Sequence, residues 1–331
     1  MYSKKHKQTA QLIIITAFVL ALTFLLLATL LNIVIYSENQ ASRGVAVADQ
    51  AAFETHTDVN KSVKGLLKED NFNNYSRSYD ERQNSVTRGI EHIFNVNKIK
   101  ETKNQRLYNG TITETENGTR IIQDSNRNFT NQYGTENWIV VDSTENTRNM
   151  TQTVERNSLH QAPNKTVWSV PGYMIFNSMF RTEFDTSSGT WVVYFVEDVS
   201  TNTIYLRTEN PSGSFYNDCA ISSSQATVNY SEQTVGNQDC PALDFVTELN
   251  NPYQIRYINS DEVEGQYHIH TSAELGSGVP DYQYNSVSSQ DSPYAVRSIY
   301  SVEYKQLYIS EEVEYDVSVY VAPNQLENES V

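Results

Sequence analysis

Basic residues are scarce in this chain of 331 residues. Lys and Arg number 24 against 40 Asp and Glu, which gives a formal net charge of -16. Such an acidic surface repels the phosphates of nucleic acids and anionic lipid headgroups, so we expect no nucleic acid partner. Acidity with little Lys suits solubility in high salt. An ordinary surface-exposed protein can share it, but we favour a halophilic archaeal source.

The sequence signatures of enzymes are also missing. There is no Gly-x-Ser-x-Gly, no phosphate-binding loop, no His-Glu-x-x-His and no Cys beside a plausible His base. We therefore expect no catalytic residue, no cofactor and no metal. His268 and His270 share one face of an expected strand with Glu264 and Gln266. This set could bind zinc or copper, but a solvated strand face is the simpler interpretation.

Cysteine occurs only twice, at Cys219 and Cys240. In an oxidising compartment such a pair predicts one disulfide, whereas in a reducing compartment it predicts two free thiols. The topology argued next places both residues outside the cell. We therefore expect a disulfide that closes a loop of about 20 residues.

One long apolar run lies near the N-terminus. Residues 12–36 carry no charge, and a helix of this length exceeds the ~30 Å hydrocarbon core of a bilayer. Basic residues precede the run and Glu38 is the first charge after it, so the positive-inside rule places the N-terminus in the cytoplasm. A cleaved signal peptide is the alternative, but its apolar core would be shorter. We expect a basic leader over 1–11, a single transmembrane helix over 12–36, and an extracellular remainder.

Small apolar residues continue at helical spacing beyond this run. They predict a helical stalk over 37–101, with a second helix near 78–97. The stripe packs either against the protein's own outer domain or against identical or related helices in a filament. Its expected members are Ala41, Val45, Ala48 and Ala52, followed by Val59, Val63 and Leu66.

After residue 102 the pattern becomes extended. Val313, Tyr315, Val317, Val319 and Val321 alternate with polar residues, which predicts a half-buried antiparallel strand. Further strands are expected at 106–114, 119–124, 137–142, 166–170, 190–196, 202–208, 226–230, 254–258, 264–271 and 296–304. We expect an α+β protein with an antiparallel, sandwich-like extracellular domain over 102–322 and a disordered tail over 323–331. The β-rich part is one domain or two subdomains split near residue 200.

Nine Asn-x-Ser/Thr sequons occur, a mild excess over chance for a chain this rich in Asn, Ser and Thr. The expected topology would expose them to a glycosylation system outside the cell. The candidate acceptors are Asn60, Asn74, Asn109, Asn117, Asn128, Asn149, Asn164, Asn229 and Asn328.

Two parts of the sequence carry a resemblance: Gln11, Leu12, Asn32 and the stretch 36–44 near the start, and the stretches 300–302, 315–317 and 321–323 near the end. With these residues, both ends of the chain resemble an uncharacterised family of haloarchaeal single-span surface proteins. The layout is also similar to type IV pilins and pseudopilins, in which an apolar helix assembles the filament core. Pilins usually carry a Glu near the start of this helix, and residues 8–37 contain none. The resemblance therefore implies a minor, initiating or tip subunit rather than a major one.

We therefore predict a membrane-anchored cell-surface protein that acts as a structural or assembly component. Its expected partners are the lipid bilayer and like or related subunits that bind through the N-terminal helix. The alternative is an anchored module whose β domain binds a ligand or another surface protein.

Overall fold

The computed structural model describes residue 27 and residues 50–73, 75–162, 178–287 and 291–322. The expected leader, nearly all of the expected transmembrane helix and the expected tail lie outside these residues. So do Ala41, Val45 and Ala48, the strand expected at 166–170, and the sequons at Asn74, Asn164 and Asn328. Within the described ranges, no helix is both long and apolar enough to cross a membrane.

Backbone contacts divide the chain into two compact units. Unit 1 comprises residues 1–59, 95–109 and 306–317. Unit 2 comprises residues 60–94, 110–305 and 318–331.

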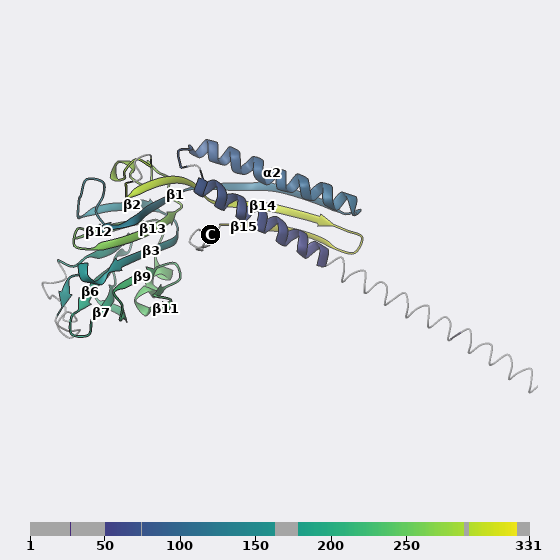
Figure 1. Cartoon of the computed structure of the whole chain (residues 1–331). Helices are drawn as coiled ribbons and strands as arrows, with labels where there is room; N and C mark the ends of the chain where they lie inside the picture. Colours follow the sequence, from purple (N-terminus) through teal and green to yellow (C-terminus); the bar gives the residue numbers. More distant parts are fainter. Residues whose placement is uncertain (1–26, 28–49, 74, 163–177, 288–290, 323–331) are drawn as a thin grey trace, which may run out of the picture. The chain divides into compact units, whose positions relative to one another are not determined.

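Two long helices are described, over residues 50–73 and in α2 (Tyr79–Lys103) (Figure 1). Ser78 caps α2, because its backbone N–H donates to the Glu81 carboxylate and its hydroxyl accepts from the Glu81 N–H. Asp80 and Glu81 lie in the first turn and Lys100 and Lys103 in the last, which suits the helix dipole. The helix expected at 78–97 is therefore present and continues for six further residues. Short 3-10 helices are η1 (Arg156–Ser158), η3 (Pro241–Glu248) and η4 (Asp281–Gln283).

Fifteen strands are described, and nearly all of their pairings are antiparallel. The first sheet has the order β11-β10-β9-β3-β13-β1-β14-β15. Its strands are β1 (Leu107–Asn128), β3 (Thr147–Glu155), β9 (Gln225–Asn229), β10 (Thr234–Val235), β11 (Gln238–Asp239), β13 (Glu264–Thr271), β14 (Tyr294–Ile309) and β15 (Glu314–Val321).

The second sheet has the order β2-β12-β5-β6-β7-β8, and β4 pairs in parallel with β6. Its strands are β2 (Trp138–Thr144), β4 (Gln161–Ala162), β5 (Arg181–Thr186), β6 (Gly189–Asp198), β7 (Thr203–Glu209), β8 (Phe215–Ile221) and β12 (Tyr253–Ile258). The expected α+β class with mainly antiparallel sheets is thus confirmed. The two strands expected at 106–114 and 119–124 form one long strand, β1.

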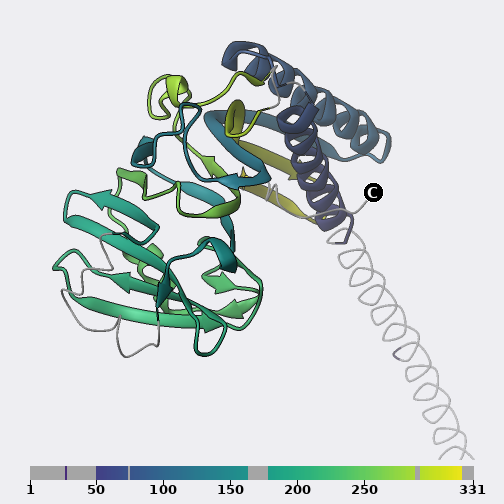
Figure 2. The ribbon, with the colours of Figure 1, turned by 60° about the vertical axis from the view of Figure 1, so that its left-hand side comes forward.

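The two sheets share one hydrophobic core in unit 2 (Figure 2). Ile121 and Val154 enter it from the first sheet, and Phe184 and Trp191 enter it from the second. Trp138 and Trp191 are both buried. Burial of this much aliphatic and aromatic surface is the main stabilising term of unit 2.

Within unit 2 the helical segments also pack on one another. Val63 and Leu67 are fully buried, as are Val86 and Ile90 of α2. The expected stripe therefore continues along the helix, but its buried residue at this point is Leu67 rather than the expected Leu66. Leu66 instead fills the space above Gly89, where an added Cβ would lie 2.5 Å from its Cδ2 atom.

Polar side chains attach the first helix to the sheet of unit 2. The Asn71 amide donates to the Ile299 carbonyl and accepts from the Ile299 N–H, each at 2.8 Å. Arg120 donates to the Asn71 carbonyl at 2.8 Å and stacks over the Phe72 ring. Asn71 is thus a buried residue that links the helix to β14.

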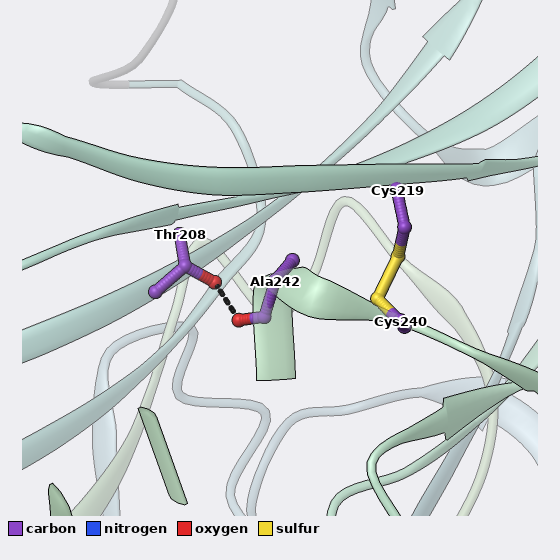
Figure 3. Close-up of a disulfide and its surroundings, with 4 residues drawn as sticks. All are labelled: Thr208, Cys219, Cys240 and Ala242. Carbon is purple, nitrogen blue, oxygen red and sulfur yellow. Dashed lines mark hydrogen bonds between the residues drawn. A yellow bond between two sulfur atoms is a disulfide. The ribbon is translucent and has the colours of Figure 1, made fainter. Parts of the chain in front are cut away.

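The expected disulfide is present and joins Cys219 of β8 to Cys240 (Figure 3). Cys240 directly precedes η3, whose Phe245 side chain stacks on Trp191 at a ring distance of 5.2 Å. Thr208 of β7 donates to the Ala242 carbonyl and holds the start of η3 against the same strands. The disulfide and this hydrogen bond together position an apolar cover over one edge of the core.

Replacing both cysteines with serine is expected to lower the free energy of unfolding by about 3 kcal/mol, because the unfolded chain loses a closed loop. Denaturant unfolding of the whole chain would measure the difference. Adding a reductant should not change the free energy of unfolding of the serine variant. The native chain should stay the more stable of the two as long as its disulfide is not reduced. Equal stability of the native and serine proteins would show that the disulfide contributes little.

Candidate interaction surface: an apolar groove in unit 1

An apolar groove of about 420 Å³ opens on unit 1. The helix at 50–73 and the start of β15 lie beside each other there (Figures 1 and 2). The groove is lined by Ala52, Phe53, His56, Val313, Tyr315 and Val317.

The helix contributes one wall of the groove. Ala52 and Val59 lie on the buried side of the helix, together with Thr55. Phe53 lies off that stripe and is 69% exposed. A large aromatic side chain that remains mostly in water contributes little to the stability of its own chain, so its apolar surface is available for an interaction.

The strand contributes the other wall. Val313, Tyr315 and Val317 are half-buried, whereas the alternate residues Glu314 and Asp316 are exposed. The sequence predicted this two-faced strand. The structure adds that the apolar face is only partly covered in unit 1.

Contacts beneath the groove fix its floor. Tyr315 stacks on the buried Tyr308 with nearly parallel rings at 5.4 Å. The His56 Nδ1 atom lies 2.9 Å from the Gln306 Oε1 atom, which orients the imidazole. Burial raises the pKa of Tyr308, so its phenol stays neutral at physiological pH.

A buried polar contact supports the helix from behind. Thr55 donates to the Glu101 carboxylate at 3.1 Å, and Arg106 pairs with the same carboxylate at 3.4 Å. Glu101 is 1% exposed, and a buried carboxylate needs such partners. The groove therefore lies on a helix and a strand that are each held in place.

The chemistry of this surface is that of apolar contact. Its lining has five apolar or aromatic side chains and a single histidine. Within the described ranges, no group of His, Cys, Asp and Glu side chains could hold a metal ion. The groove therefore suits the apolar side chains of a partner.

The described sequons occupy different environments. Asn109 is exposed, and Asn60, Asn117, Asn128 and Asn229 are partly exposed. Asn149 is 7% exposed and its amide nitrogen is buried, so modification there would have to precede folding. None of these residues lines the groove.

The two strand histidines belong to unit 2 and do not line the groove. Glu264 and Gln266 of β13 are exposed, but His268 is half-buried and His270 is 2% exposed. The His270 Nε2 atom lies 3.0 Å from the Ser298 hydroxyl, and its ring contacts that of Tyr300 edge-on. Burial, together with the nearby Arg120 and Arg148, lowers the pKa of His270 to about 3.

This histidine predicts a stability loss in mild acid. The unfolded chain binds a proton near pH 6.5, whereas folded His270 stays neutral until about pH 3. Stability therefore falls as the pH drops below 6.5, by about 2 kcal/mol between pH 7 and pH 5. Unfolding measured across this range should lose that slope in a His270→Gln variant. An unchanged slope would show that His270 does not control it.

Of the groove residues, the sequence assigns Ala52 to helix packing and Val313, Tyr315 and Val317 to an apolar strand face. It missed Phe53 and His56. Phe53 could have been identified from the sequence, because it is a large aromatic residue directly after Ala52 of the small-residue stripe. No family model matches the chain, and neither does any curated protein or solved structure.

Proposed function

We propose that the chain is a membrane-anchored cell-surface protein that works as a structural or assembly component. Its layout resembles that of type IV pilins and pseudopilins, and a minor or tip subunit fits it best. The observation that carries the proposal is the apolar groove of unit 1, because its helical wall follows the uncharged run 12–36 in sequence.

The anchoring part of the proposal is supported by sequence. Residues 12–36 are long enough to span a bilayer as a helix. Basic residues precede them and Glu38 follows, which orients the chain with the β-rich part outside the cell. A disulfide between Cys219 and Cys240 is compatible with that compartment.

The assembly part of the proposal is supported by exposed apolar side chains in unit 1. Phe53, Val96, Ile99 and Leu107 are each at least 48% exposed. Such side chains offer apolar surface for contact with another chain. Partner subunits would cover them while the β-rich part is displayed.

The second candidate is an anchored binding module for a ligand or another surface protein. A volume of about 420 Å³ falls in the range of small-molecule sites. Such sites normally add several converging polar groups, and here the lining offers only the His56 imidazole and the Tyr315 hydroxyl. The assembly function is therefore the better supported of the two.

Intact-protein mass spectrometry of the chain from native membranes, with mapping of its N-terminal peptide, tests the pilin-like part. A mature start near Ala10 or Gln11 would indicate prepilin-type processing. An intact start at Met1 or Tyr2 would overturn that part and favour a plain signal anchor that displays a binding module.

A further inference from the structure

We propose that unit 1 binds an extended partner segment in which apolar and basic residues alternate, and that this segment adds as a strand along residues 313–317. The inference rests on the proposed assembly function and specifies the chemistry of the partner. Three features of the β15 region support it: its position in the sheet, its apolar face and its acidic face.

The first feature is the sheet edge. In the strand order, β15 is the terminal strand, and β14 is its one neighbour among the described residues. Backbone N–H and C=O groups on the other side of a terminal strand are available to pair with another chain. Strand addition uses these groups for affinity and pockets beside them for specificity.

The second feature is the apolar face. Side chains on one face of an added strand would lie beside Val313, Tyr315 and Val317. These three residues line the groove, and Phe53 of the helix lines it from the opposite wall. Every second side chain of the partner would therefore enter an apolar site, which requires Val, Ile, Leu or an aromatic residue at those positions.

The third feature is the acidic face. Glu312, Glu314 and Asp316 are exposed and alternate with the apolar residues. No ion pair formed among the described residues involves any of these carboxylates. Lys or Arg at the intervening positions of the partner would lie opposite them, and such cross-strand pairs of opposite charge are favourable.

The same charges disfavour a second copy of β15 as the added strand. Antiparallel pairing of two copies would bring carboxylates opposite or next to carboxylates, and like charges across a strand pair are destabilising. Charged edge residues are also a common protection against pairing between identical sheets. The same carboxylates that repel a second copy would therefore attract a basic partner strand.

The test uses the full-length chain in detergent micelles and a fluorescent peptide of about nine residues in which Val and Lys alternate. Saturable binding is expected by fluorescence anisotropy. A peptide with Glu in place of every Lys should bind about tenfold more weakly or not at all.

Backbone methylation separates strand addition from simple adhesion to the groove. Amides of alternate residues point to opposite edges of a strand. Two methylated peptides are therefore compared, one with all Val amides methylated and one with all Lys amides methylated. One of them should lose binding, and the other should bind nearly as well as the unmethylated peptide. Equal binding by both methylated peptides would overturn the proposal.

Variants of the protein provide the matching test. Glu314→Lys combined with Asp316→Lys should weaken binding about tenfold, because both residues face the basic positions. Glu145→Lys combined with Glu232→Lys makes the same charge change at exposed sites in unit 2 and should stay within about twofold of the native chain. If both double substitutions weaken binding equally, the effect comes from net charge alone and the proposal is overturned.

Failure of this inference can be distinguished from failure of the proposed function. If the Val-Lys peptide does not bind while the native chain forms large complexes in its membrane, strand addition is wrong and the assembly function stands. If Phe53→Ser dissociates such complexes into single chains and the peptide still does not bind them, the groove serves another partner, such as a second copy, and the inference is overturned.

Discussion

Replacing Asp70 with alanine is expected to lower the free energy of unfolding by about 3–5 kcal/mol. The Arg82 side chain is fully buried in unit 2, and its guanidinium lies 3.0 Å from the Asp70 carboxylate, which is 4% exposed. Removing the carboxylate takes away a counter-charge of this buried cation. Burial already lowers the pKa of Arg82, and Asp70 opposes that shift.

A matched control uses the other partner of the same carboxylate. Arg77 lies 2.8 Å from Asp70, but its side chain is 35% exposed. Arg77→Ala should therefore cost no more than about 1 kcal/mol. Denaturant unfolding followed by tryptophan fluorescence would compare the two variants. Equal losses would show that the burial of Arg82 does not determine the effect.

The second large effect is expected at Phe129, the centre of an aromatic cluster in unit 2. Its ring lies 5.0–5.6 Å from those of Phe180, Tyr257 and Tyr267, and the residue is fully buried. Phe129→Ala is expected to cost about 3–5 kcal/mol, because it removes buried surface and leaves a cavity that the rigid rings cannot fill.

The control for this substitution is Phe53→Ala, which removes the same ring from a side chain that is 69% exposed. This variant should unfold within about 0.5 kcal/mol of the native chain. Thermal and denaturant unfolding would measure both. A small loss at Phe129 would mean that the cluster repacks, which would contradict the close packing described for this core.

Prediction from the sequence succeeded where one face of a strand is apolar. The last strand was predicted because Tyr315 and Val317 alternate with the exposed Glu314 and Asp316. The strand expected at 264–271 has the observed bounds of β13, but burial alternates only in its first half, since His270 and Thr271 are both buried.

It failed where polar residues are buried. Strand β3 was missed because Gln152 is fully buried in it, and Asn149 has a left-handed φ of 51°. The Gln152 amide donates to Thr182 and accepts from the Tyr230 hydroxyl. These partners come from distant parts of the chain, so the sequence gives no local sign that this glutamine can be buried.

The groove could be predicted only in part, for a related reason. Alternation identified the apolar face formed by Val313, Tyr315 and Val317, but exposure depends on what covers that face. The helix with Phe53 is more than 250 residues away in sequence. Its place beside β15 depends on tertiary contacts such as His56 with Gln306.

The central claim, that this is an anchored assembly component, is tested most directly by the mass of the native complex. The chain would be extracted from its own membranes in mild detergent and measured by sedimentation. We expect a complex well above the 37.7 kDa of one chain, and a return to single chains in a Phe53→Ser variant, with Tyr133→Ser as the exposed aromatic control. A native chain that sediments as a monomer with its detergent would contradict the assembly function and favour the binding module.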